Sequence, residues 1–150
     1  MNTSRAINQY AHVNHQSLIN EASPHQLIAM LINGALERLT FAKGCIERNE
    51  IANKAIMLGK AMDIIGGLQN SLDMENGGEI STNLDDLYNY MNRRLLVANS
   101  KNDISAVDEV IDLMNNIKAG WDGIPQEFHH LSASGEPTEN SKDSSVAGAL

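Results

Sequence analysis

The chain has 150 residues, of which 42% are hydrophobic and 4% aromatic, a composition typical of one soluble globular domain with a largely aliphatic core. Its 19 acidic and 11 basic residues give a formal net charge of −8, which argues against binding to nucleic acid or to an anionic membrane surface. No apolar run approaches the ~20 residues of a membrane span, the N-terminus lacks a signal-peptide core, and Cys45 stands alone, so we expect a cytoplasmic protein.

Residues 1–20 are expected to form a weak helix. Their apolar stripe is broken at Asn14, and several asparagines lower the helix propensity. The apolar positions are Ile7, Tyr10, Ala11 and Leu18. We therefore interpret this stretch as a mobile N-terminal segment of a single domain that extends over residues 1–131.

Residues 23–46 give a much stronger helical pattern. Ser23 can cap the helix start, Pro24 occupies a position where no amide donor is needed, and Gln26 can close a capping box. His25, in the first turn, is expected to be exposed. Apolar residues then follow at helical spacing, at Leu27, Ile28, Leu31, Ala35, Leu39, Ala42 and Ile46.

After a short break at residues 48–50, the helical spacing resumes and continues to residue 72. The expected core seam of this second helix is Ile51, Ala55, Leu58, Met62, Ile65, Leu68 and Leu72, with Ala61 and Ile64 beside it. Residues 73–79 are expected to form a turn that reverses the chain at Gly77 and Gly78.

The third helix is expected over residues 80–99, with Ser81–Asn83 supplying capping side chains. Its apolar face comprises Ile80, Leu84, Leu87, Met91, Leu95 and Ala98, widened by Tyr88 and Leu96. Asp103 is the expected N-cap of the last helix, whose apolar face comprises Ile104, Val107, Ile111, Met114, Ile117, Trp121 and Ile124. Residues 132–150 are small, polar and mildly acidic, which predicts a disordered tail.

Four long amphipathic helices joined by short connections predict an all-α protein, an antiparallel four-helix bundle with an additional N-terminal helical segment. No motif for an enzyme or a cofactor is present. A di-metal centre in such a bundle would need two Glu-x-x-His motifs on facing helices. The single such spacing, Glu127 with His130, follows Pro125 outside the bundle.

Apolar residues also lie beside the main seams, at Met30, Phe41, Met57, Ile64, Tyr88 and Leu96. They indicate either a wide core face or a groove that accepts amphipathic helices, a role for which methionine-rich surfaces are well suited. Gly34, Gly59 and Gly66 permit the same two interpretations, since glycines ease packing within a bundle and also allow a foreign helix to approach.

Several segments together resemble the flagellin-specific export chaperones, the FliS family. They are Ala22-Ser23-Pro24, residues 27–31, residues 34–36, Asn53-Lys54-Ala55, Ile64-Ile65, residues 68–73, residues 77–80, residues 83–91, Arg94-Leu95, Ala98-Asn99 and Trp121. The sequence departs from the family pattern at Ile32-Asn33, where a Tyr-Asp pair is common, and at Asn89, where the family often has an aspartate. Both departures change polar detail and leave the apolar pattern intact.

The resemblance implies a cytoplasmic chaperone that binds the disordered C-terminal segment of flagellin, prevents premature polymerisation and aids flagellar export. It also implies that Ile7 and Tyr10 take part in binding, and it permits the export-gate membrane protein and flagellar regulators as further partners. Combining resemblance and pattern, we expect partner contacts at Ile7, Tyr10, Leu27, Met30, Leu31, Gly34, Leu84, Leu87, Tyr88, Met91 and Leu95. The alternatives are a helical adaptor without flagellin specificity and, less consistent with the sequence, a metalloenzyme bundle.

Overall fold

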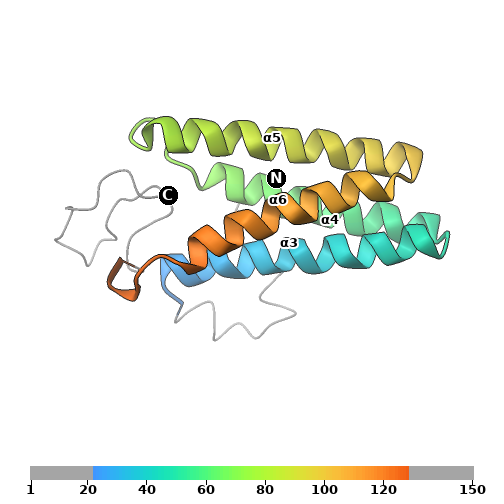
Figure 1. Ribbon diagram of the computed structural model, residues 1–150, viewed down its shortest axis with the longest axis horizontal. Helices are drawn as coiled ribbons and strands as arrows, with labels where there is room; N and C mark the ends of the chain where they lie inside the picture. The colour runs from blue at the N-terminus through green and yellow to red at the C-terminus, as the bar shows by residue number, and fades with distance from the viewer. Residues whose placement is uncertain (1–21, 129–150) are drawn as a thin grey trace.

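The computed structural model describes residues 22–128, which form four long helices and one short 3-10 helix. The helices are α3 (Pro24–Glu47), α4 (Ile51–Asn70), α5 (Gly78–Lys101) and α6 (Ile104–Asp122), and η1 spans Gln126–Phe128. Each helix runs opposite to the one before it (Figure 1), which confirms the expected all-α antiparallel bundle. The expectations for residues 1–20 and 132–150 lie outside the described residues.

The four helices pack as a closed ring. α3 packs against α4 and α6, and α5 packs against the same two helices from the opposite side. The buried core is largely aliphatic. Its fully enclosed residues include Leu31, Leu39, Leu58, Ile65, Leu68, Met91, Leu95, Val107, Val110 and Met114.

The start of α3 follows the expected capping box. The Ser23 hydroxyl accepts a hydrogen bond from the Gln26 amide at 3.1 Å, and the Ser23 amide donates to Gln26 Oε1 at 2.8 Å. Pro24 opens the helix, where its missing amide costs nothing. These contacts fix the point at which the chain enters the bundle.

The prediction for His25 was wrong, because this side chain is 93% buried. Its ring stacks on the Trp121 indole with centroids 4.9 Å apart and planes 7° apart. Trp121 Nε1 donates to the His25 carbonyl oxygen at 3.0 Å, and His25 Nε2 lies 2.8 Å from the Trp121 carbonyl oxygen, where it can only donate. This His25–Trp121 clasp joins the first turn of α3 to the last turn of α6.

The turn between α4 and α5 depends on glycine at one position. A Cβ atom on Gly77 would lie 1.8 Å from Ser81 Oγ and 2.6 Å from the Asp73 carbonyl oxygen, so any larger residue forces the turn to move. Asp73 accepts hydrogen bonds from the amides of Glu75 and Asn76, both at 3.0 Å. The capping role expected for Ser81–Asn83 was wrong, since α5 begins at Gly78 without a side-chain cap and Ser81 is buried.

The opposite end of α5 is held by a buried lysine. Lys54, 3% exposed, donates from Nζ to the Asn99 carbonyl oxygen at 2.8 Å and to Asn102 Oδ1 at 2.6 Å. Its ammonium group lies where the α5 dipole favours positive charge. Asn102 is the left-handed C-cap of α5, with φ of 53°, and Asp103 then caps α6 through the amides of Ser105 and Ala106, as expected.

No helix among residues 22–128 combines the length and apolarity that crossing a membrane requires.

Candidate partner-binding surfaces

The first half of the expected α4 seam faces outward. Ile51 is 48% exposed and Ala55 is also exposed, whereas Leu58, Ala61, Ile64, Ile65 and Leu68 form the buried face. The expected seam therefore mixed two stripes of the helix. The outward stripe follows helical spacing and consists of Ile51, Ala55, Gly59, Met62 and Gly66.

This stripe runs along the side of α4 that borders α5. Gln69 continues it, five turns after Ile51, and Gln69 Nε2 donates to Asp85 Oδ1 at 2.7 Å and to Asn89 Oδ1 at 2.9 Å. Together with the Lys54 hydrogen bonds to Asn99 and Asn102, these contacts fix the register of the antiparallel pair. In that register Leu96, 57% exposed, lies level with Gly59.

We name this surface the α4/α5 strip: Ile51, Ala55, Gly59, Met62 and Gly66 of α4 with Leu96 of α5. Among the described residues, a Cβ atom added to Gly59 or Gly66 would meet nothing within 4 Å. The interpretation that these two glycines ease packing within the bundle was therefore wrong for residues 22–128. They leave two shallow gaps seven residues apart on an otherwise apolar surface.

One polar atom on the same side of α5 lacks a hydrogen bond. Asn92 Oδ1 is buried and has no partner within residues 22–128. A buried acceptor without a donor is costly, because it has lost its hydrogen bond to water without replacement. Asn92 follows Asn89 by one turn, so this acceptor belongs to the α5 wall that faces α4.

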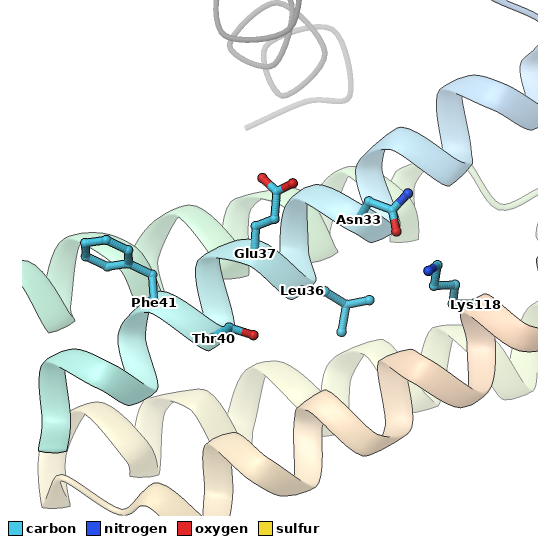
Figure 2. A pocket seen from close by; sticks show the side chains of 6 residues that line it. All are labelled: Asn33, Leu36, Glu37, Thr40, Phe41 and Lys118. Atoms are coloured by element: carbon cyan, nitrogen blue, oxygen red, sulfur yellow. The ribbon is translucent and has the colours of Figure 1, made fainter.

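A second surface lies between α3 and α6 (Figure 2). This α3/α6 groove has a volume of about 620 Å³ and is lined by Asn33, Leu36, Glu37, Thr40, Phe41 and Lys118. Leu36 and Thr40 point toward α6, and Asn33 faces Lys118, whereas Glu37 and Phe41 point outward. Phe41 is 51% exposed, although large aromatic side chains are more often buried. It is one of only two phenylalanines in the sequence.

The far edge of α6 is tied to α5 by a polar cluster. Glu109 accepts from the Tyr90 hydroxyl at 2.5 Å and from Arg94 Nε at 2.7 Å. These two donors hold the pKa of Glu109 below its usual range, because both favour the carboxylate. Arg93 lies over the Tyr90 ring, 6.0 Å from its centroid. The cluster links α5 to α6 on that side of the bundle.

The expected partner-contact residues divide into three groups. The first group is buried and comprises Leu31, Gly34, Tyr88, Met91 and Leu95. In this group, burial raises the pKa of Tyr88 to about 12. Leu27, Met30, Leu84 and Leu87 are half-buried. Ile7 and Tyr10 lie outside the described residues. Partner contact by any of these residues stays a prediction. Ile51 and Leu96 of the α4/α5 strip are more exposed than the described residues of this set.

Of the apolar residues beside the seams, Ile64 and Tyr88 belong to the core, whereas Phe41 and Leu96 are exposed. Sequence reasoning thus singled out Leu96 but missed Ile51 and Ala55. The seven-residue spacing of Gly59 and Gly66 was the available signal, because it marks a stripe that a core helix would fill with larger residues.

Within residues 22–128, no three His, Cys, Asp or Glu side chains are grouped closely enough to hold a metal ion. Cys45 is a buried free cysteine. His130, the partner that the Glu127 spacing would need, lies outside the described residues.

Comparison with known proteins identifies relatives over nearly the whole helical region. The family model described as "Flagellar protein FliS" matches residues 6–127. The flagellar secretion chaperone FliSB of Pseudomonas aeruginosa is 49% identical over 124 residues, which cover 83% of this chain and 98% of that protein.

Two other relatives are named flagellar secretion chaperone FliS. The Salmonella typhimurium protein is 48% identical over 122 residues, covering 81% of this chain and 90% of that protein. The Vibrio cholerae protein is 43% identical over 128 residues, which cover 85% of this chain and 94% of that protein. With the helical bundle described above, these matches show that the chain belongs to the FliS family.

Proposed function

We propose that this protein is a cytoplasmic flagellar export chaperone that binds the C-terminal segment of flagellin, which we call the guest. Three of its relatives carry the name flagellar secretion chaperone. The observation that carries the binding mode is the α4/α5 strip, an exposed apolar surface with two open glycines.

The strip fits an amphipathic helix. Ile51 and Gly66 are fifteen residues apart, which corresponds to about 22 Å along α4, the length of a four-turn helix. The gaps over Gly59 and Gly66 are about 10 Å apart, so a guest helix with large apolar side chains at positions i and i+7 would fill both. Leu96 would contact the side chain that sits over Gly59.

Binding would be coupled to folding of the guest. A segment without fixed structure loses conformational entropy as it becomes helical, and burial of its apolar face offsets that loss. Covering that face also prevents it from pairing with other flagellin molecules, which is the proposed protection against premature polymerisation. The helix-in-groove mode thus accounts for both binding and chaperone activity.

A long guest would extend beyond the strip. The half-buried residues Leu27 and Met30 on α3, and Leu84 and Leu87 on α5, are proposed further contacts. Ile7 and Tyr10 are proposed to take part through the N-terminal segment. The export-gate membrane protein and flagellar regulators are proposed recipients or modulators of the loaded chaperone.

The decisive experiment fills the glycine gaps. Gly59→Leu and Gly66→Leu should each weaken binding of a flagellin C-terminal peptide at least tenfold in calorimetry, because the new side chain occupies the place of the guest. Gly120→Leu is the matched control, since Gly120 is a helical glycine on α6 that is equally open among the described residues.

Folding effects are separated from binding effects in the same variants. Leucine has a higher helix propensity than glycine by about 0.5–1 kcal/mol, so all three variants should be at least as stable as the parent. Equal affinity of the Gly59, Gly66 and Gly120 variants would refute the strip as the guest site. Equal binding of flagellin with and without its last ~40 residues would instead favour the general adaptor, since coupled folding needs that tail.

A further inference from the structure

One buried acceptor is not used by the fold. Asn92 Oδ1 is shielded from water and has no hydrogen-bond partner within residues 22–128. The residue as a whole is only half-buried, so its amide lies at the edge of the core rather than deep inside it. Native proteins seldom leave such an acceptor without a donor, because the group has given up its hydrogen bonds to water. A donor that arrives from outside the bundle would supply what the fold omits.

The helical position of Asn92 places it on the side of α5 that borders α4. Asn89, three residues earlier, accepts a hydrogen bond from Gln69 of α4. The Asn99 carbonyl oxygen, seven residues later, accepts one from Lys54 of the same helix. Residues three, four or seven positions apart share one face of a helix. Asn92 therefore belongs to this face, between the two polar ties of the α4/α5 pair.

The register of the pair places Asn92 midway between the two glycine gaps. Leu96 lies level with Gly59, so Asn92, one turn earlier on α5, lies level with the α4 segment between Gly59 and Gly66. Each gap is about 5 Å away along the helix axis. Met62 in that segment is half-buried and unbranched, so a guest can move its side chain without moving a helix.

The α4/α5 strip offers no other polar side chain for recognition. Its own residues are glycine, alanine, isoleucine, leucine and methionine, none of which forms a strong hydrogen bond through its side chain. Apolar contacts discriminate weakly between guests of similar size, whereas a buried polar group rejects a guest that cannot pair with it. An unused acceptor beside an apolar surface is thus suited to selecting among guests.

We propose that Asn92 determines which guest the strip accepts, and that the guest carries a side-chain hydrogen-bond donor midway between its two apolar anchors. This inference rests on the proposed binding of the guest helix to the α4/α5 strip. When the guest binds, Met62 moves aside and the Asn92 side chain turns outward to meet the donor.

The spacing of the gaps locates the donor in the guest. With anchors at positions i and i+7 over the two glycines, the residues at i+3 and i+4 lie on the same face and reach the level of Asn92. Glutamine suits these positions, because its amide nitrogen donates to Asn92 Oδ1 and brings no charge to be buried.

The test combines two peptides with variants of the full chain. Two 18-residue amphipathic peptides share leucines at i and i+7 and differ at i+3 and i+4, where one has glutamine and the other methionine, which is similar in size but has no donor. Calorimetry gives the ratio of the two affinities. Asn92→Leu should shift this ratio at least fivefold in favour of the methionine peptide, because the acceptor is gone. Asn92→Ala, which adds no bulk, should shift it in the same direction.

Two controls place the effect. Asn83→Leu makes the same change at an exposed position of α5 and should leave the ratio unchanged. Gly66→Leu should weaken binding of both peptides, since both are expected to occupy the strip. In denaturant titrations Asn92→Leu should be at least as stable as the parent, because it removes a buried acceptor that lacks a donor.

The possible failures can be told apart. If both peptides depend on Gly66 but their affinity ratio is the same in the parent and in the Asn92 variants, the strip stands and the role of Asn92 is refuted. If neither peptide responds to Gly66→Leu, the strip is refuted as the guest site, and this inference with it. A marked loss of stability in both Asn92 variants would show that the acceptor already has a partner in the fold, which would also overturn the proposal.

Discussion

The α3/α6 pair and the α4/α5 pair are closed in different ways. The first is joined at one end by the buried aromatic clasp of His25 and Trp121, and its outer groove combines apolar and charged residues. The second is tied near both ends by side-chain hydrogen bonds from Lys54 and Gln69, with small and apolar residues between them. We therefore expect the α3/α6 pair to be stabilised mainly by buried apolar contacts. The α4/α5 pair should depend more on the hydrogen bonds of its buried polar groups.

Removing the clasp should have the largest effect. Trp121→Ala takes away a buried ring, its stacking on His25 and the Nε1 hydrogen bond to the His25 carbonyl oxygen, and should lower the free energy of unfolding by about 3–5 kcal/mol in denaturant titrations. Trp121→Phe keeps a ring but loses the Nε1 donor, so it should cost clearly less. A smaller loss for the alanine variant than for the Lys54 variant below would reverse the comparison.

The free energy of unfolding should fall at high pH because of Tyr88 on the buried face of α5. Tyr88 is buried, and its pKa is raised to about 12, above the ordinary value of 10, because burial disfavours the phenolate. Its contribution to stability is complete below pH 10 and is lost as the pH rises through about 12, by up to about 2–3 kcal/mol. Tyr88→Phe should flatten this part of the pH profile measured by chemical denaturation, and an unchanged profile would contradict the assignment.

Breaking the polar tie of the α4/α5 pair should have an intermediate effect. Lys54→Met keeps most of the apolar stem but leaves the Asn99 carbonyl and Asn102 side chain without their donor, and should cost about 1–3 kcal/mol. Amide hydrogen exchange should increase at the C-terminal turn of α5 while the His25 end of α3 stays protected. Uniform loss of protection would show that the two pairs do not respond separately.

The smallest effect is expected at the Lys43–Asp108 ion pair, because both side chains are partly exposed to water. A double-mutant cycle with Lys43→Met and Asp108→Asn should give a coupling smaller than the loss caused by Lys54→Met, and one that shrinks further as salt is raised. A coupling that is large and insensitive to salt would place this pair among the main contacts of the α3/α6 interface.

Much of the fold could be predicted from the chain because its signals are local. The capping box at Ser23, the cap at Asp103 and the glycine turn at residues 77–78 all concern neighbouring residues, whose spacing fixes their chemistry. Apolar periodicity likewise located four helices. The buried face of α4 was harder to predict, because its apolar residues follow two adjacent stripes. Only the position of the neighbouring helices decides which stripe is buried.

The buried polar contacts and the candidate surfaces were less predictable, because they depend on residues that are far apart in the sequence. His25 looked like an exposed residue of a first turn, and only its meeting with Trp121, 96 positions later, explains its burial. The burial of Lys54 was not predicted, because its acceptors lie at the end of α5, 45 and 48 positions later. Contacts between distant parts of the chain leave no local pattern, whereas the open glycines of the α4/α5 strip did leave one in their spacing.

The clasp also sets an order for synthesis of the protein. Its two residues lie near opposite ends of the described chain, so the first turn of α3 emerges from the ribosome long before its aromatic partner exists. A nascent chain that stops before Ile104 has only three of the four helices, and one that stops before Trp121 lacks the aromatic partner of His25. The single tryptophan of the sequence is thus a natural fluorescent reporter of the moment when the bundle closes.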